Sequence, residues 1–141
     1  MKTFETGSAE ETTGVGRVIA QELRPGSLVV LSGSLGAGKT TLVKGIAEGF
    51  HAANASDVTS PTFTLIHEYR GPVVTLYHID LYRIDTQREL DTLALDDLME
   101  PHTILLLEWG EKFSRFVQEK SAAITLEHLG GDRRKISFTL G

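Results

Sequence analysis

The sequence predicts one α/β domain over residues 1–141, in three layers around a mixed sheet with parallel core strands and antiparallel additions. Three observations support this fold class. An aliphatic segment, a glycine-rich turn and an amphipathic segment follow one another between residues 28 and 50. Two pairs of β-rich segments flank glycine-containing turns further along the chain. A chain of 141 residues also has the length of one domain with one core.

The first third of the chain predicts a helix, a strand and a second helix. Ser8 and Glu11 have capping-box spacing, and apolar residues then recur at helical spacing as far as Leu23, before Pro25. Residues 28–31 are all aliphatic and predict a buried strand, whereas apolar side chains at helical spacing predict a helix over 41–50. Residues 51–60 are small and polar, and we expect a loop there.

The rest of the chain adds strands and shorter helices. Residues 63–69 and 73–79 are rich in β-forming side chains on either side of a Gly-Pro turn, and we expect them to pair antiparallel. Leucines among acidic residues predict a helix over 81–99, which Pro101 closes. We further expect a strand at 103–107, a short helix at 111–119, and a hairpin of 123–129 with 135–140.

Composition and charge exclude several classes of protein. The net charge of −5 argues against a chain that wraps nucleic acid through its own surface. The absence of cysteine excludes disulfides, thiolate metal sites and a cysteine nucleophile, and fits a cytosolic location. The first residues are polar and acidic, so we expect no signal peptide, and the longest aliphatic runs are too short to span a membrane.

Residues 33–40, Gly-Ser-Leu-Gly-Ala-Gly-Lys-Thr, match the pattern G-x-x-x-x-G-K-[ST] in full. The glycines let such a loop curl so that its backbone N–H groups point at phosphate oxygens. Lys39 is expected to reach the β- and γ-phosphates, and the Thr40 hydroxyl to bind Mg²⁺. A predicted strand before the loop and a helix after it favour a nucleotide site in a P-loop NTPase-like fold over an incidental glycine-rich turn. The expected cradle residues are Gly33, Gly36, Ala37, Gly38, Lys39 and Thr40.

Two acidic residues follow predicted buried strands. Asp80 ends the segment 73–80, and Glu108 ends the segment 104–108. Because carboxyl ends of parallel strands face the ligand crevice, both carboxylates could meet at one metal ion. We expect Glu108 to hold Mg²⁺ together with Thr40, and Asp80 to bind a metal water or orient the attacking water. The structural alternative is that Asp80 caps the following helix and Glu108 merely marks the end of a strand.

Kinases, GTPases and ATPases share this phosphate-binding pattern, so other residues must separate them. The guanine-binding stretch N-K-x-D is absent, because Asn54 is the only asparagine and alanine follows it. A small-molecule kinase needs an arginine-bearing lid, for which Arg83, Arg88 and Arg115 are candidates, but nothing identifies an acceptor site. A further alternative is a nucleotide-dependent interaction module in which hydrolysis is incidental.

Beyond these patterns, the chain resembles the TsaE (YjeE) family, the ATPase component of the bacterial machinery that makes threonylcarbamoyladenosine on tRNA. The matching segments are residues 36–41, 60–65, 78–83 and 108–109, in the family's order and spacing. The Ser-Pro-Thr-aromatic and His-x-Asp-x-Tyr-Arg motifs are much more specific than the phosphate-binding pattern. Ser34 departs from the family, which commonly has Asp there.

The resemblance implies a weak ATPase that uses ATP and Mg²⁺ and acts with the TsaD and TsaB proteins. Those partners would hold most of the tRNA, and no membrane is involved. By resemblance, Thr62 lies in a switch segment near the γ-phosphate and joins Lys39 and Asp80 as a catalytic candidate. The resemblance also implies that Thr41, Thr12 and Arg133 contribute to nucleotide binding.

Several other side chains keep two interpretations. Trp109, the only tryptophan, either packs against the core or faces a partner. Tyr82 and Arg83 either pack locally or sense the switch and anchor an interface. The five histidines show no metal-ligand spacing, and His78 in a strand is more typical of packing than of metal binding.

Overall fold

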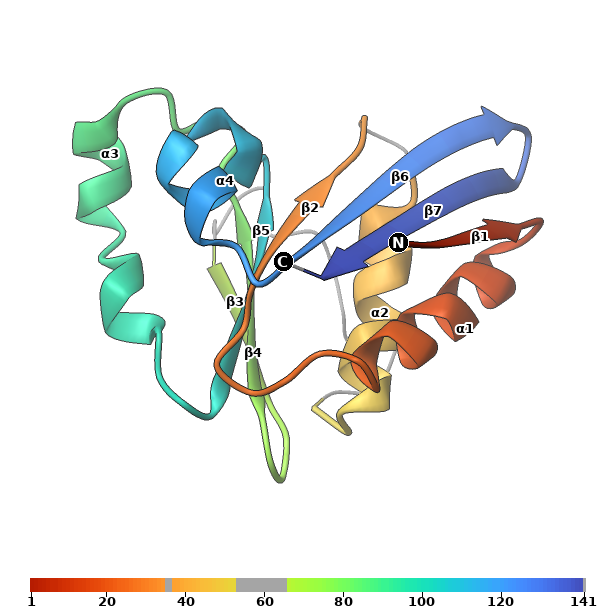
Figure 1. The fold of residues 1–141 in the computed structure, drawn as a ribbon, viewed down its shortest axis with the longest axis horizontal. Helices are drawn as coiled ribbons and strands as arrows, with labels where there is room; N and C mark the ends of the chain where they lie inside the picture. Colours follow the sequence, from red (N-terminus) through yellow and green to blue (C-terminus); the bar gives the residue numbers. More distant parts are fainter. Residues whose placement is uncertain (35–36, 53–65, 141) are drawn as a thin grey trace.

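The computed structural model describes residues 1–34, 37–52 and 66–140. At its centre lies a sheet with the strand order β1-β7-β6-β2-β5-β4-β3 (Figure 1). The strands are β1 (Lys2–Thr6), β2 (Leu28–Ser32), β3 (Ile66–Arg70), β4 (Thr75–Asp80), β5 (Thr103–Glu108), β6 (Ala122–Gly130) and β7 (Arg133–Leu140). The helices are α1 (Ala9–Ala20), α2 (Lys39–Gly49), α3 (Gln87–Thr92) and α4 (Ser114–Glu119), with 3₁₀ turns η2 (Leu95–Leu98) and η3 (Gly110–Lys112).

The sheet is mixed in the way that the sequence predicts. Strand β2 pairs in parallel with β5 on one side and β6 on the other, and β4 pairs in parallel with β5. The additions are antiparallel, because β3 pairs with β4, β7 with β6, and β1 with β7. Parallel core strands with antiparallel additions are therefore confirmed.

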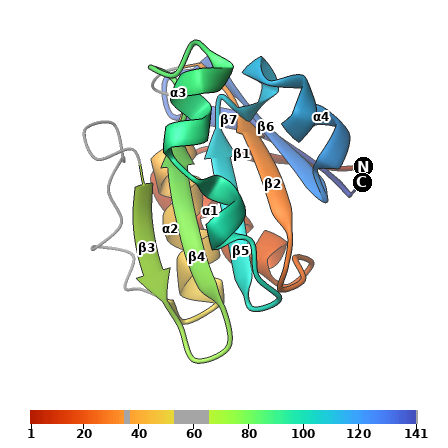
Figure 2. The same ribbon diagram turned by 90° about the vertical axis from the view of Figure 1, so that its left-hand side faces the viewer.

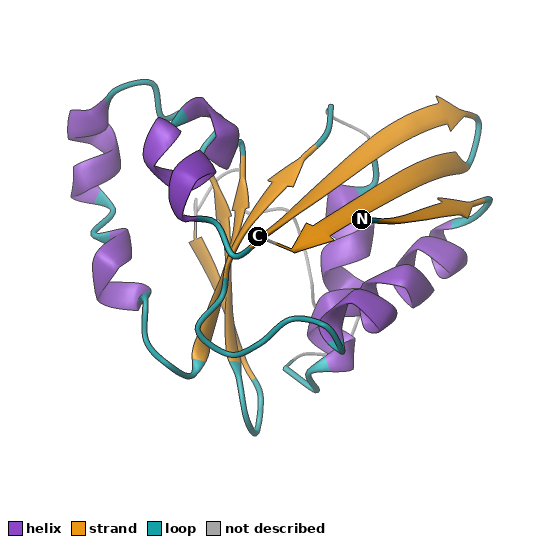
Figure 3. Ribbon diagram, viewed as in Figure 1, coloured by secondary structure: helices purple, strands orange, loops and turns teal. Residues whose placement is uncertain are grey.

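Helices cover both faces of this sheet and complete three layers (Figure 3). Helices α1 and α2 cover one face, and their apolar side chains pack on alternate residues of the strands, such as Leu76, Ile104 and Leu106. The intervening residues, such as Ile79 and Leu105, pack on the opposite face with α3, η2 and α4 (Figure 2). Among the described helices, none has the length and apolar character that crossing a bilayer requires.

Two features of this fold position the residues of interest. The parallel strands β2, β4 and β5 all end at the same edge of the sheet, where α2 begins. Helices α1 and α2 approach each other through glycines: a Cβ on Gly16 would lie 2.4 Å from the carbonyl oxygen of Leu42. A Cβ on Gly45 would lie 2.0 Å from the carbonyl oxygen of Thr13. Only residues without a side chain permit this backbone contact.

The predicted helix over 81–99 is wrong. After β4 the chain turns, with Ile84 N donating to Leu81 O, and α3 starts only after Thr86, whose side chain accepts from Glu89 N. Ala94 then adopts a left-handed conformation (φ +50°) that separates α3 from η2. The buried leucines of this region reach the core from turns and short helices, so their spacing does not reflect one continuous helix.

Smaller differences concern the other predicted helices and the start of the chain. Helix α1 has the predicted cap, with Ser8 Oγ accepting from Glu11 N, but it ends at Ala20 rather than near Leu23. The predicted helix 111–119 is divided into η3 and α4 at Phe113. Strand β1, for which the sequence gives no prediction, adds to the sheet through its pairing with β7.

Candidate functional site

The described ends of the turn from β2 to α2 have backbone conformations that require glycine. Gly33 has φ +154°, and a Cβ there would lie 3.0 Å from Leu126 O of β6. Gly38 has φ +98° directly before α2, a conformation that residues with a side chain rarely adopt. Leu42 N donates to Gly38 O, so regular helical bonding starts here, at the helix end that attracts anions.

Lys39 starts α2, and its side chain is buried at the sheet edge. Its Nζ donates to Gly33 O at 2.7 Å and lies 3.4 Å from Glu108 Oε1. The same ammonium group sits 4.8 Å from the centre of the Trp109 ring, within the range of a cation–π contact. Lys39 is therefore held by a carbonyl, a carboxylate and an aromatic face, all of which phosphate oxygens could replace.

The two predicted acids lie side by side. Asp80 ends β4, Glu108 ends β5, and the two are direct partners in the parallel register. Both side chains are buried. Asp80 Oδ1 accepts from Tyr82 N at 2.9 Å and so holds the turn that follows β4. Asp80 does not cap a helix, because α3 begins only after Thr86, but the structure does bring the two carboxylates to one place.

The Glu108 carboxylate binds two side chains. Its Oε1 faces Lys39, and its Oε2 lies 2.5 Å from His78 Nε2. Burial raises the pKa of Glu108, but the hydrogen bond and charge of His78, together with Lys39, outweigh burial and hold the pKa below its ordinary value. Glu108 is therefore an ionised carboxylate in a largely water-free position, available to a cation.

His78 was not expected at the site. It is completely buried, and the sequence interpretation placed it in packing. In a strand, side chains two residues apart share a face, so His78 lies on the same face as Asp80 and Leu76, towards α2. The spacing His-x-Asp at the end of a predicted strand could therefore have indicated that His78 lies beside Asp80.

The oxygen atoms at this edge fit Mg²⁺ bound together with a phosphate. The candidates are the Thr40 hydroxyl at the start of α2 and the carboxylates of Asp80 and Glu108. Within the ranges that the structure describes, no three His, Cys, Asp or Glu side chains form a group able to hold a metal by protein ligands alone. Mg²⁺ commonly takes one or two protein ligands and completes its shell with phosphate oxygens and water, so this donor set suits it.

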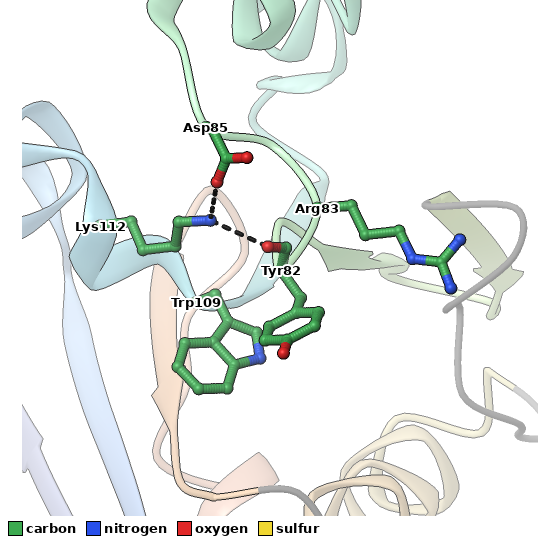
Figure 4. Close-up of a pocket in the computed structure, with 5 residues that line it drawn as sticks. All are labelled: Tyr82, Arg83, Asp85, Trp109 and Lys112. Carbon is green, nitrogen blue, oxygen red and sulfur yellow. Dashed lines mark hydrogen bonds and ion pairs between the residues drawn. The ribbon is translucent and has the colours of Figure 1, made fainter.

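A cavity of about 540 Å³ opens among residues that follow β4 and β5 (Figure 4). Trp109 follows Glu108 with φ +65°, and its ring lies 5.2 Å from that of the half-exposed Tyr82. Lys112 Nζ fixes the opposite wall through Tyr82 O at 2.9 Å and Asp85 Oδ1 at 3.2 Å. Figure 4 shows Arg83 directed away from the aromatic pair. Trp109 is half-buried, so it both packs against the core and borders the cavity.

A second, smaller pocket borders Gly38. Its lining includes Thr12 from α1, Thr41 from α2 and Arg134 from β7. Arg133, the residue that the resemblance suggests, is exposed and does not line this pocket. Arg134 occupies the position instead, because it shares a face with Ile136, which packs towards the helices, whereas Arg133 lies on the opposite face.

Some predicted residues are outside the description. Gly36 of the cradle and Thr62 of the expected switch segment belong to ranges 35–36 and 53–65, which the structure does not describe. Of the other predicted cradle residues, Ala37 is buried against the core cluster, and Ser34, the departure from the family pattern, is exposed.

Comparisons with known proteins agree on one family. The sequence model of "Threonylcarbamoyl adenosine biosynthesis protein TsaE" matches residues 6–136. The tRNA threonylcarbamoyladenosine biosynthesis protein TsaE of Bacillus subtilis is 38% identical over 136 residues, covering 96% of this chain and 84% of that protein. The protein of the same name from Treponema pallidum is 37% identical, covering 92% and 94%. The crystal structure of Bacillus subtilis YdiB superposes with a TM-score of 0.75 at 34% identity, covering 99% of this chain and 84% of that one.

Proposed function

Because the chain belongs to the TsaE family of threonylcarbamoyladenosine biosynthesis proteins, we propose that it is a Mg²⁺-dependent ATPase that supports this tRNA modification. One observation carries the proposal. Lys39 Nζ lies 3.4 Å from Glu108, and Asp80 is the direct neighbour of Glu108 in the sheet. A lysine of the phosphate-binding pattern and two carboxylates thus meet at one edge, which is the set of groups that phosphoryl transfer to water uses.

ATP binding follows from the contacts of the cradle. The Lys39 ammonium exchanges Gly33 O and Glu108 for oxygens of the β- and γ-phosphates, while the N-terminal amides of α2 add further donors. The surface around Thr12, Thr41 and Arg134, whose small pocket borders Gly38, contacts the nucleoside. No guanine-binding stretch is present in the sequence, so we propose ATP rather than GTP.

Hydrolysis depends on orientation and charge. Bound Mg²⁺ supplies positive charge that stabilises the phosphoryl group in the transition state. Thr40 and Glu108 offer the oxygen ligands that hold it, and Glu108 already stands there ionised. Asp80 orients the attacking water or a water of the metal shell, from its place beside Glu108. By the family resemblance, we propose that Thr62 senses the γ-phosphate.

In this proposal, ATP hydrolysis changes the state of a protein complex and does not convert a metabolite. We propose TsaD and TsaB as the partners and the cytosol as the location, with tRNA held mainly by the partners because this chain has a net charge of −5. We propose that hydrolysis returns the complex to the state that starts the next round. Because the reaction would then depend on the partners, we expect ATP hydrolysis by the isolated chain to be slow.

A second candidate is an interaction module whose function is to bind ATP. The hydrogen bond from Tyr82 N to Asp80 Oδ1 favours it, because a carboxylate engaged in a turn is less available to water. The Asp80→Asn variant separates the two candidates in repeated rounds of tRNA modification with TsaD and TsaB. Continued rounds without hydrolysis would support the module, and arrest after one round supports the ATPase.

The direct test of the proposed site is calorimetry of ATP binding to the Lys39→Ala variant. Charge-assisted hydrogen bonds contribute about 1.5–3 kcal/mol, so affinity should fall about 10- to 100-fold. Lys44→Ala, a half-buried lysine of the same helix, is the matched control and should bind ATP as the wild type does. Equal ATP affinity of the Lys39 variant and the wild type would refute the site.

A further inference from the structure

His78 is a buried polar side chain that the proposed mechanism does not use. None of its surface is exposed, and it lies in β4 beside Leu106 of β5. Its Nε2 is 2.5 Å from Glu108 Oε2, a short distance for a hydrogen bond between side chains. A buried imidazole costs free energy unless it is paired, so a completely buried histidine calls for a reason in the site.

The partners of the ring indicate which nitrogen carries the proton. Among the described residues, Nδ1 has no hydrogen-bond partner and is buried. Because the ionised Glu108 carboxylate can only accept a hydrogen bond, the ring must donate from Nε2, whatever Nδ1 carries. The arrangement therefore favours Nε2–H donating to Oε2.

This bond matters most once a nucleotide has bound. Glu108 is held at present by Lys39 on Oε1 and by His78 on Oε2. When Lys39 turns to the phosphates, Glu108 loses its contact on Oε1 and keeps the one on Oε2. His78 then fixes the rotation of the carboxylate, so that Oε1 remains directed at the site.

We propose that His78 is a positioning residue, which through its Nε2–H holds Glu108 in the orientation that binds Mg²⁺ with ATP. This inference rests on the proposed function, since it needs Glu108 to serve the metal. His78 itself contacts neither metal nor nucleotide. Hydrogen-bond partners of metal ligands typically change metal affinity about 10- to 100-fold when they are removed.

The test compares two substitutions of His78 by calorimetric titration of the protein–ATP complex with Mg²⁺. His78→Leu keeps a comparable apolar volume and removes the donor, whereas His78→Gln retains an N–H group that can reach Glu108. We expect His78→Leu to raise the Mg²⁺ concentration for half-saturation at least tenfold. His78→Gln should restore much of the loss, and ATP affinity without Mg²⁺ should be equal in all three proteins. Equal Mg²⁺ titrations of the wild type and His78→Leu would overturn the inference.

A double-mutant cycle separates positioning from a general loss of structure. In a Glu108→Gln background, His78→Leu should have no further effect on the Mg²⁺ titration, because there is no carboxylate left to orient. An equal tenfold loss of Mg²⁺ affinity in the wild-type and Glu108→Gln backgrounds would refute a positioning role for His78. If Glu108→Gln alone leaves the Mg²⁺ titration unchanged, the role of Glu108 in the proposed function fails. If Glu108→Gln impairs it and His78→Leu does not, only the inference about His78 fails.

Discussion

The close contact between α1 and α2 allows the effect of one added methyl group on protein stability to be worked out from the structure. In Gly16→Ala, the new Cβ would lie 2.4 Å from Leu42 O and 2.8 Å from Gly45 Cα. Ordinary van der Waals contact of a Cβ begins at 3.4 Å. The neighbouring atoms belong to the backbone of α2, so no side chain can rotate away. The two helices must therefore separate by about 1 Å.

Two opposing terms set the size of the effect. Overpacking of a close interior contact costs about 1–3 kcal/mol, with backbone clashes at the upper end. Replacing glycine by alanine inside a helix stabilises the helix by about 1 kcal/mol. We expect Gly16→Ala to lower the free energy of unfolding by about 2 kcal/mol. Since the separation also moves Thr12 away from Thr41, ATP affinity should fall as well.

Gly14→Ala is the matched control, because it makes the same change two residues earlier in the same helix. Its Cβ would meet only the end of the Arg17 side chain, at 3.6 Å. The helix-propensity term then acts alone, and the variant should be more stable than the wild type by about 0.5–1 kcal/mol. Urea unfolding followed by circular dichroism measures both changes. A Gly16→Ala variant as stable as the Gly14→Ala variant would refute the argument from close helix contact.

Three further predictions concern the site. Asp80→Asn should retain ATP binding and lower single-turnover hydrolysis by about 10²–10⁴-fold, and equal loss of binding would remove the distinct role of Asp80. Arg134→Ala should weaken ATP binding in calorimetry, whereas Arg133→Ala should not, because only Arg134 lines the pocket beside Gly38. Since the pKa of Glu108 is lowered in the folded state, its stabilising effect is complete above the ordinary value of 4.5 and lost as pH falls through the folded-state pKa. The difference in unfolding free energy between wild type and Glu108→Gln should therefore shrink in acid; a difference that does not change with pH would contradict it.

The parts of the site that depend on local pattern could be predicted from the sequence. The glycine spacing of residues 33–40 implies a loop between a strand and a helix, and the structure has β2 and α2 there. Asp80 and Glu108 each end a predicted buried strand, and parallel strands place their carboxyl ends together. His78 could have been added by the same reasoning, because alternate residues of a strand share a face.

Other parts depend on contacts between distant residues. Strand alternation places Arg134 on the face of Ile136, but which elements border the pocket beside Gly38 depends on how β7 packs against α1 and α2. Strand β1 owes its conformation to pairing with β7, at the other end of the chain. The region 81–99 contained a local signal after all, since Thr86 and Glu89 have capping-box spacing and Thr86 Oγ1 accepts from Glu89 N at the true start of α3.

The place of β2 in the sheet has a consequence for how the chain folds. Both of its neighbours come from the distal part of the sequence: Leu28 pairs with Leu105 of β5, and Val29 pairs with Ala122 of β6. Contacts of such long sequence separation slow folding, because the intervening chain must be ordered before they form. During synthesis, the strand that carries the phosphate loop therefore leaves the ribosome long before its partners exist. A chain that ends before β5 and β6 leaves both edges of β2 unpaired, so we expect it to hold the phosphate loop less firmly than the sequence of 141 residues does.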